Sequence, residues 1–176
     1  FLLGGKAKLD ARTARAREGG PSRGNSSMAT FELTRHVVGA QAVGIARAAY
    51  EVAIQYAKER NVFGKPIIEH QAVGFRIARM ASRIEAARQL VYHSAALKDA
   101  GRPCLMEACM AKLEASETAE QVCSDTIQTL AGYGYLTDFP AERLYRDARV
   151  TKIYEGTNDI QHLVILRELQ KRAAQG

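Results

Sequence analysis

Residues 36–61 read HVVGAQAVGIARAAYEVAIQYAKERN, and their periodicity indicates the architecture of the whole chain. Apolar side chains recur here at steps of three and four, which is the spacing of one buried face of an α-helix. Six positions are assigned to that face: Val38, Ala42, Ile45, Ala49, Val52 and Tyr56. The helix is predicted to follow the capping residues 25–27 and to end before Gly64 and Pro66.

Two further segments carry the same periodicity, so the sequence predicts three long helices. The second spans about residues 69–100, with a buried face made of Ile77, Met80, Ile84, Ala87 and Val91. The third ends at residues 132–134, and its face holds Met106, Cys109, Leu113, Ser116, Cys123, Ile127 and Leu130, with Glu120 as the polar exception. Shorter helices are expected at about 141–147 and 160–171. Long helices joined by short turns pack antiparallel, so the expected fold class is all-α, an antiparallel (four-)helix bundle.

The composition fits a helical protein with an aliphatic core. Hydrophobic residues make up 47% of the chain and aromatic residues only 7%, with no tryptophan. No apolar run reaches the roughly 18 residues that span a bilayer, so we predict no membrane insertion. Cys104, Cys109 and Cys123 fit neither a zinc site nor a disulfide framework. We therefore predict small buried thiols and no metal site.

The net charge of +6 is concentrated near the start of the chain. Residues 6–23 hold six basic and two acidic side chains, a balance of +4 that leaves +2 for the rest. A short basic arm binds phosphates electrostatically, but a solvated connecting segment explains the same composition. We predict no nucleic-acid partner, a flexible linker from the end of a preceding domain at residues 1–24, and a helical bundle domain at 25–176.

Four short strings stand out, and their order along the chain is more informative than any one of them. They are FELTR at 31–35, YAKERNVFGKPI at 56–67 with HQ at 70–71, QTLAGYGY at 128–135 with DFPAER at 138–143, and RDAR at 146–149 leading to IYEGTNDIQ at 153–161. Each alone has an ordinary explanation, such as a helix end marked by a cation, glycine and proline. The glycine-broken turn at 150–157 carries Glu155, and turns between helices are common places for catalytic residues.

Together and in this order, the four strings resemble the acyl-CoA dehydrogenase family over about residues 29–170. The segments 56–67 and 153–157 are the most specific parts of the resemblance. It implies the carboxy-terminal helical domain of a flavin-dependent enzyme that converts an acyl-CoA to its trans-2-enoyl-CoA. Glu155 would be the base that removes the α-proton of the thioester, and a β-hydride would pass to FAD.

The resemblance also implies cofactor contacts, position by position. Arg60 and Phe63 match residues that contact the FAD of a neighbouring subunit. Gln128 and Gly132 match the segment that approaches the adenine half of FAD across the same interface, and Thr157 matches a pyrophosphate contact. The full set of expected cofactor residues is Arg60, Phe63, Gln71, Gln128, Gly132, Thr157 and Asp159.

Substrate contacts are implied near the catalytic base. Arg35 matches a residue that pairs with coenzyme A, Thr34 would line the acyl pocket, and Gly156 lies beside the base. Some branches of the family carry the catalytic carboxylate at the position of Thr34. Because a threonine cannot serve as that base, Glu155 is the consistent choice.

The sequence departs from the family pattern at several places. Asp159 stands where a Gln, Glu or similar residue often follows the threonine, so its cofactor role is expected to be weak, and the stretch 6–25 is longer and more basic than the usual connection. Ala131 stands where the family usually has the first of two glycines, which we expect to be a small change. The 24 residues before the first helix cannot encode the amino-terminal helical domain and the central β domain of the family. The alternative hypothesis is therefore a non-catalytic helical oligomerisation module, or an inactive fragment of such an enzyme.

The resemblance sets expectations for partners and location as well. The expected partners are an acyl-CoA substrate, an electron-transfer flavoprotein as electron acceptor, and further copies of the chain in a homodimer or homotetramer. The expected location is the cytoplasm, or the mitochondrial matrix in a eukaryote.

Overall fold

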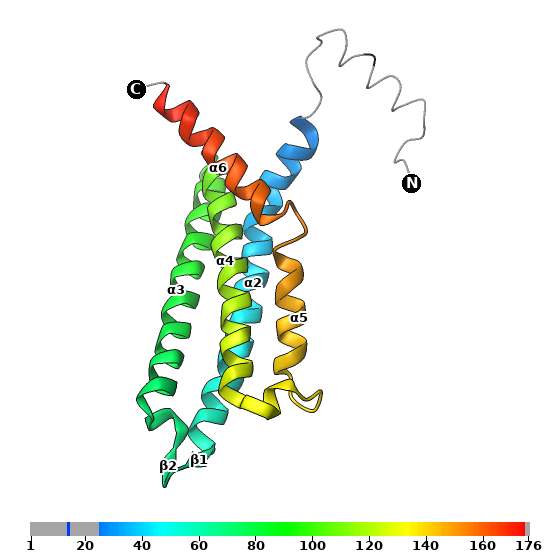
Figure 1. Ribbon diagram of the computed structural model, residues 1–176. Coiled ribbons are helices and arrows are strands. Elements are labelled where there is room, and N and C mark those ends of the chain that lie inside the picture. Colours follow the sequence, from blue (N-terminus) through cyan, green and yellow to red (C-terminus); the bar gives the residue numbers. More distant parts are fainter. Residues whose placement is uncertain (1–13, 15–24, 175–176) are drawn as a thin grey trace.

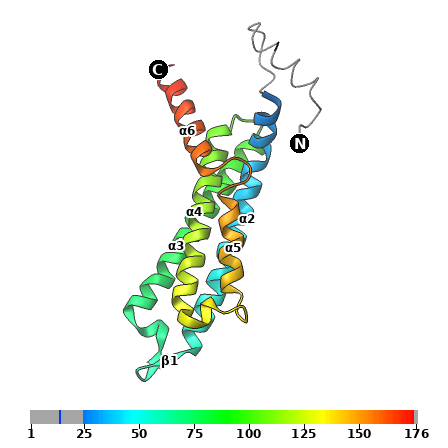
Figure 2. The ribbon, with the colours of Figure 1, turned by 45° about the vertical axis from the view of Figure 1, so that its right-hand side comes forward.

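The computed structural model describes Ala14 and residues 25–174 of the chain. Within these residues, consecutive long helices run antiparallel: α2 (Asn25–Glu59), α3 (Gln71–Asp99) and α4 (Leu105–Leu130) (Figure 1). The short helix α5 (Ala141–Thr151) packs beside α2 and α4, and α6 (Asn158–Ala173) crosses the end of the bundle near the start of α2 (Figure 2). The predicted all-α bundle is confirmed, with α5 as its short fourth helix. The predicted linker 1–24 lies outside the described residues, except for Ala14.

A small hairpin that the sequence did not predict joins α2 to α3. Strand β1 (Asn61–Val62) pairs antiparallel with β2 (Lys65–Pro66). The two residues between the strands, Phe63 and Gly64, have φ of 54° and 81°, and positive φ at both central positions is the geometry of a tight hairpin turn. Two-residue strands are too short to show alternation, so only Gly64 signalled the turn. A 3₁₀ turn, Ile67–Glu69, then leads into α3.

Three helix boundaries differ from those predicted. Helix α2 already includes residues 25–27, which were expected to precede it. Helix α5 continues to Thr151 instead of ending near residue 147, and α6 begins at Asn158 instead of residue 160. Thr151 is fully buried and its hydroxyl donates to the Ala148 carbonyl at 2.7 Å, so packing outweighs the weak helix propensity of β-branched residues. The turn that carries Glu155 is therefore reduced to residues 152–157.

The face that α2 buries consists mostly of alanine. Val38, Ala42 and Ala49 lie on it as predicted, whereas Ile45, Val52 and Tyr56 flank it and are only half-buried. Five alanines of α2 are fully buried: Ala42, Ala46, Ala49, Ala53 and Ala57. Helix α4, which packs against α2, also buries alanines: Ala108, Ala111, Ala115 and Ala119. Small side chains let two helices approach closely, which pushes the larger apolar residues to the flanks.

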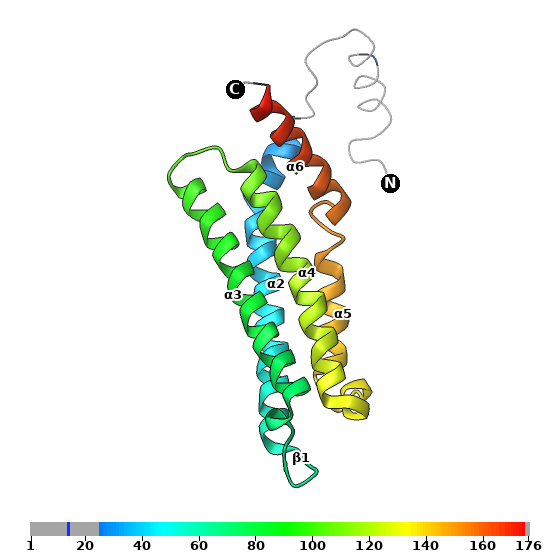
Figure 3. The ribbon, with the colours of Figure 1, turned by 60° about the vertical axis from the view of Figure 1, so that its left-hand side comes forward.

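Helix α4 is the central helix of the bundle, between α3 and α5 (Figure 3). Every residue predicted for its buried face is buried except Ile127, which is half-buried, and the predicted face of α3 is buried throughout. The three cysteines are buried, as predicted. Burial, together with the nearby charge of Asp147, raises the pKa of the Cys123 thiol to about 12, so this thiol is unreactive in the folded protein.

Among the described residues, one segment of α2, Thr34–Glu59, is long and apolar enough to cross a membrane by length and composition alone. The core helix of a water-exposed bundle has the same properties, and α2 packs against α3, α4 and α5. The absence of membrane insertion stays a prediction.

Candidate functional site

The predicted site residues fall into two clusters at opposite ends of the bundle (Figure 1). The first, which we call the Glu155 cluster, consists of Thr34, Arg35, Glu155, Gly156, Thr157 and Asp159. The second, the hairpin-end cluster, consists of Arg60, Phe63, Gln71, Gln128 and Gly132. The 26-residue segment Thr34–Glu59 of α2 separates them, which is roughly 38 Å at 1.5 Å per residue. One copy of the chain therefore does not bring all of these residues into one site.

The turn between α5 and α6 holds Glu155 in a left-handed backbone conformation. Glu155 has φ of 56° and Gly156 has φ of 90°. A non-glycine residue in this region costs about 1–3 kcal/mol and persists only where its surroundings impose it. The half-buried Glu155 carboxylate accepts a hydrogen bond from the Thr34 hydroxyl of α2, with Oγ1 2.6 Å from Oε2. The structure thus brings two predicted site residues, 121 positions apart in sequence, into direct contact.

Buried polar side chains of α4 and α6 form hydrogen bonds with this turn and with Asn158, the first residue of α6. The Lys112 ammonium donates to the Gly156 carbonyl at 3.0 Å and to Asn158 Oδ1 at 2.8 Å. Ser116 Oγ also donates to Asn158 Oδ1, at 3.1 Å. From α6, Gln161 Nε2 donates to the carbonyls of Gly156 at 2.8 Å and Glu155 at 3.2 Å. The main-chain carbonyls of Glu155 and Gly156 therefore each accept a hydrogen bond from a buried side chain.

Sequence reasoning missed Lys112 and Gln161, although one signal was present. Lys112 lies three residues after Cys109 and four before Ser116, on the face that was predicted to be buried. A lysine at such a position requires hydrogen-bond partners. Burial, with the charges of Arg35 and Lys152 adding to it, lowers the pKa of Lys112 to about 8.

An ion-pair network joins α4 to the end of α5 beside the turn. The Lys152 ammonium contacts Glu120 at 2.6 Å and Glu117 at 3.2 Å, and Arg149 contacts Glu120 at 2.9 Å. Burial alone would raise the pKa of Glu120, but hydrogen bonds from Lys152 and Arg149 outweigh it and lower that pKa. These ion pairs explain why Glu120, a polar residue, lies on the predicted buried face of α4. Although carboxylates gather here, the described residues contain no group of His, Cys, Asp and Glu side chains able to hold a metal ion.

Arg35 is not disposed as the resemblance implies. Its side chain is only 2% exposed, and Nη1 donates to Cys109 Sγ at 3.0 Å. Its Nε atom has no hydrogen-bond partner among the described residues. Because the guanidinium is directed into the bundle, this geometry does not favour a contact with coenzyme A.

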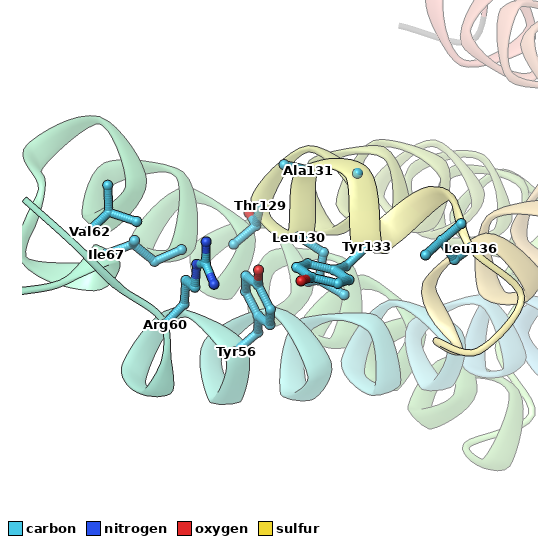
Figure 4. Close-up of a pocket in the computed structure, with 10 residues that line it drawn as sticks. Tyr56, Arg60, Val62, Ile67, Thr129, Leu130, Ala131, Tyr133 and Leu136 are labelled. Carbon is cyan, nitrogen blue, oxygen red and sulfur yellow. The ribbon is translucent and has the colours of Figure 1, made fainter.

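The hairpin-end cluster borders an open pocket of about 610 Å³. Tyr56 and Arg60 project from the end of α2 toward the turn that follows α4 (Figure 4). Tyr133 packs against Tyr56 with ring centroids 6.3 Å apart, and Gly132 lines the same pocket. The pocket therefore combines a cation, aromatic faces and exposed backbone.

The other members of this cluster lie around the pocket and point outward. Phe63, at the tip of the hairpin, is 93% exposed. Gln71 opens α3 and Gln128 lies in the last turn of α4, and both side chains are exposed. Within the chain, the Phe63 ring packs edge-on against His70, with ring centroids 6.2 Å apart.

Positive φ values at non-glycine residues occur, among the described residues, in the segments that carry the predicted site. They are found at Phe63, Ala131 and Glu155. Ala131 ends α4 with φ of 54° and ψ of −130°, a combination that suits glycine and strains any other residue. The replacement of a glycine by Ala131 is therefore not the small change expected from the sequence.

Known proteins share the sequence and the fold of this chain. Residues 23–170 match the family model described as acyl-CoA dehydrogenase, C-terminal domain. The chain is 52% identical over 143 residues to an acyl-CoA dehydrogenase of Bacillus subtilis, covering 81% of this chain and 38% of that protein. It is 48% identical over 148 residues to a cyclohexane-1-carbonyl-CoA dehydrogenase of Geobacter metallireducens, covering 84% and 39%.

Among solved structures, the butyryl-CoA dehydrogenase of Megasphaera elsdenii superposes with a TM-score of 0.83 at 42% identity, covering 86% of this chain and 40% of that one. The chain spans about two fifths of the length of these relatives. The match of sequence and fold over most of the chain places it in the acyl-CoA dehydrogenase family, as the family's carboxy-terminal helical domain.

Proposed function

We propose that this chain is the carboxy-terminal part of an FAD-dependent enzyme that oxidises an acyl-CoA to its trans-2-enoyl-CoA, with Glu155 as the catalytic base. The observation that carries the proposal is the Glu155 turn, where a carboxylate is held at positive φ and oriented by Thr34. Strained residues of this kind cluster at functional sites. Thr157 and Asp159 lie directly after the turn, at the start of α6.

Proton removal from a thioester requires a well-placed base. The α-proton is weakly acidic, so the carboxylate must lie within hydrogen-bond reach of it and the thioester carbonyl must be polarised. Thr34 holds Oε2 of Glu155, which leaves Oε1 as the oxygen to accept the proton. We propose that main-chain N–H groups of the turn donate to the thioester carbonyl beside the base. Gly156 is needed for packing within the turn, because a Cβ there would lie 3.0 Å from Gln161 Nε2.

The residues of both clusters fit contacts with FAD. At the hairpin end, the planar Arg60 guanidinium suits a pyrophosphate, and the rings of Tyr56 and Tyr133 offer flat faces. At the other end, the N-terminus of α6 favours anions, and the Thr157 hydroxyl makes no cap hydrogen bond within the described part of the helix. When bound, FAD supplies the acceptor for the β-hydride of the substrate.

The separation of the clusters supports a homo-oligomer. Since roughly 38 Å of helix lies between them, we propose that a complete site takes the Glu155 cluster of one copy and the hairpin-end cluster of another. A homodimer or homotetramer satisfies this requirement.

The names of relatives include enzymes of both reaction directions and point to an electron partner. One relative is named an acryloyl-CoA reductase (NADH), from Anaerotignum propionicum, at 48% identity. Removing and adding an α-proton are the same step in opposite directions, so one base serves both. A chain in a structure of the electron transferring flavoprotein of Acidaminococcus fermentans is 49% identical with a TM-score of 0.80, covering 81% of this chain and 37% of that one. This supports an electron-transfer flavoprotein as the acceptor. The proposed location remains the cytoplasm, or the mitochondrial matrix in a eukaryote.

The test is Glu155→Gln in the full-length enzyme. Loss of the base should lower kcat at least about 1,000-fold, while flavin absorbance of the purified protein stays unchanged. Glu51→Gln, which alters an exposed carboxylate paired with Arg47, is the matched control and should keep full activity. Substantial acyl-CoA oxidation by the Glu155→Gln enzyme would refute the assignment.

Flavin content separates this proposal from the non-catalytic alternative. A purified full-length protein that binds FAD and bleaches on addition of acyl-CoA supports the enzyme. A colourless, stable oligomer would instead favour a helical oligomerisation module.

A further inference from the structure

A buried lysine lies beneath the Glu155 turn and takes no part in the proton transfer. The Lys112 side chain is 0% exposed, and the atoms that its ammonium contacts are the neutral oxygens of Gly156 and Asn158. Moving a charged lysine out of water is costly, and an apolar residue of similar size would fill the same space more favourably. The position is therefore explained by what the ammonium donates to, and not by packing.

A second buried side chain, from α6, donates to the same Gly156 carbonyl oxygen as Lys112. Gln161 of α6 is 0% exposed, and its Nε2 donates to the carbonyls of Gly156 and Glu155. Its Oε1 has no hydrogen-bond partner within the described residues. The side chain is thus held at the cost of an unsatisfied acceptor, which again points to the two carbonyls as the reason for its placement.

We infer that Lys112 and Gln161 form a clamp on the main-chain carbonyls of Glu155 and Gly156, and that this clamp positions the Glu155 carboxylate for proton transfer. The second half of the inference rests on the proposed function. Donors from α4 and α6 fix the direction of both carbonyls, so the turn cannot relax to an ordinary right-handed conformation. The side chain of Glu155 is then directed toward Thr34. Lys112 and Gln161 are positioning residues, because neither is placed at the reacting atoms.

The decisive variant is Lys112→Met in the FAD-loaded, full-length enzyme. A misplacement of the base by about 1 Å costs on the order of 100-fold in rate, so kcat should fall about 10- to 100-fold while KM changes less than about 3-fold. Hydrogen exchange of the main-chain amides at residues 153–158 should become at least about 10-fold faster. Flavin absorbance should be unchanged.

The matched control is Thr126→Ala, also on α4. This change removes a buried hydroxyl that donates to the carbonyls of Ala49 and Val122, and it leaves both donors on the Gly156 carbonyl. It should leave kcat within about 3-fold of the parent and the amide exchange of the turn unchanged. Gln161→Met should act in the same direction as Lys112→Met. Because both donors hold one carbonyl, the double variant should lose less than the product of the two single losses.

The inference is overturned if folded Lys112→Met enzyme keeps the parent kcat and the parent exchange of the turn. Should that variant not fold, Gln161→Met decides by the same two measurements. Failure of the proposed function looks different. If the protein has no acyl-CoA activity, or if Glu155→Gln stays active, the amide exchange still reports whether the clamp holds the turn.

Discussion

At the scale of single residues, the Glu155 turn combines strain with support. Glu155 adopts a backbone conformation that glycine would take without strain, but glycine has no carboxylate. Thr34 from α2, Lys112 from α4 and Gln161 from α6 hold it there. Side chains from three helices thus contact the proposed catalytic carboxylate and its turn, so the bundle is part of the proposed site and not only its scaffold.

Ala131 also has a backbone conformation that strains a non-glycine residue, so replacing it by glycine should stabilise the protein. The change Ala131→Gly should raise the free energy of unfolding by about 1–2 kcal/mol, because a cost of about 1–3 kcal/mol is relieved and somewhat under 1 kcal/mol of chain entropy is lost. Urea unfolding measures the difference. Ala100→Gly is the control, since Ala100 also ends a helix but with φ of −77°; it should lower stability. Equal effects of the two changes would contradict the strain at Ala131.

Lys112 should make stability depend on pH in the alkaline range. Its folded pKa of about 8 lies below the ordinary value of 10.5, so between these values the unfolded chain binds more protons. The free energy of unfolding should therefore rise from pH 8 to 10.5 relative to Lys112→Met, and this contribution is lost as pH falls through 8. The groups facing the ammonium are Arg35, Cys109, Glu117 and Lys152. A difference between parent and variant that is flat with pH would show that Lys112 is not desolvated.

At the scale of helices, close approach governs the core. The facing alanines of α2 and α4 let these helices approach closely. Gly39 extends that contact, because a Cβ there would lie 3.3 Å from the Ala111 carbonyl oxygen of α4, and it would also lie 2.9 Å from Val91 Cγ2 of α3. Periodicity alone favours the large residues for the buried face. Packing places the small ones there, because interhelical distance depends on side-chain size at the contact.

Just after α4, two nearby glycines differ in how closely other atoms approach them. A Cβ added at Gly134 would lie 2.7 Å from the Ile127 carbonyl oxygen, whereas one at Gly132 would meet nothing within 4 Å. We expect Gly134→Ala to destabilise the protein by about 1–3 kcal/mol. Gly132→Ala should leave thermal stability nearly unchanged and weaken FAD binding, as measured by flavin titration. A Gly132→Ala protein that melts as early as Gly134→Ala would contradict this division.

At the scale of the whole molecule, the two clusters lie at opposite ends of one bundle, and this predicts complementation between subunits. Glu155→Gln and Arg60→Ala enzymes should each be inactive, the second through lost FAD affinity. In a mixed dimer, one shared site contains both changes and the other contains neither. Co-refolded mixtures should thus recover up to about a quarter of parental activity, since about half of randomly paired dimers are mixed. Absence of recovery, with mixed dimers verified by mass, would place both clusters in one subunit's site.

Much of this organisation was predictable from sequence. The spacing of apolar residues predicted three long helices and nearly all of the buried faces of α3 and α4. The ordered strings predicted the family, which the comparisons confirm. Missed features were those that periodicity does not report: a two-residue hairpin, the extension of α5 to Thr151, and the buried donors Lys112 and Gln161.

Local patterns along the chain thus suffice for the helices and the position of the Glu155 turn, because helix periodicity and turn residues act over a few neighbours. Only tertiary structure determined that Thr34 meets Glu155, that Arg35 is turned into the core, and that the two clusters lie roughly 38 Å apart. These relations depend on how helices distant in sequence pack against one another. Side-chain size at the α2–α4 contact sets that packing, and a single sequence does not display it.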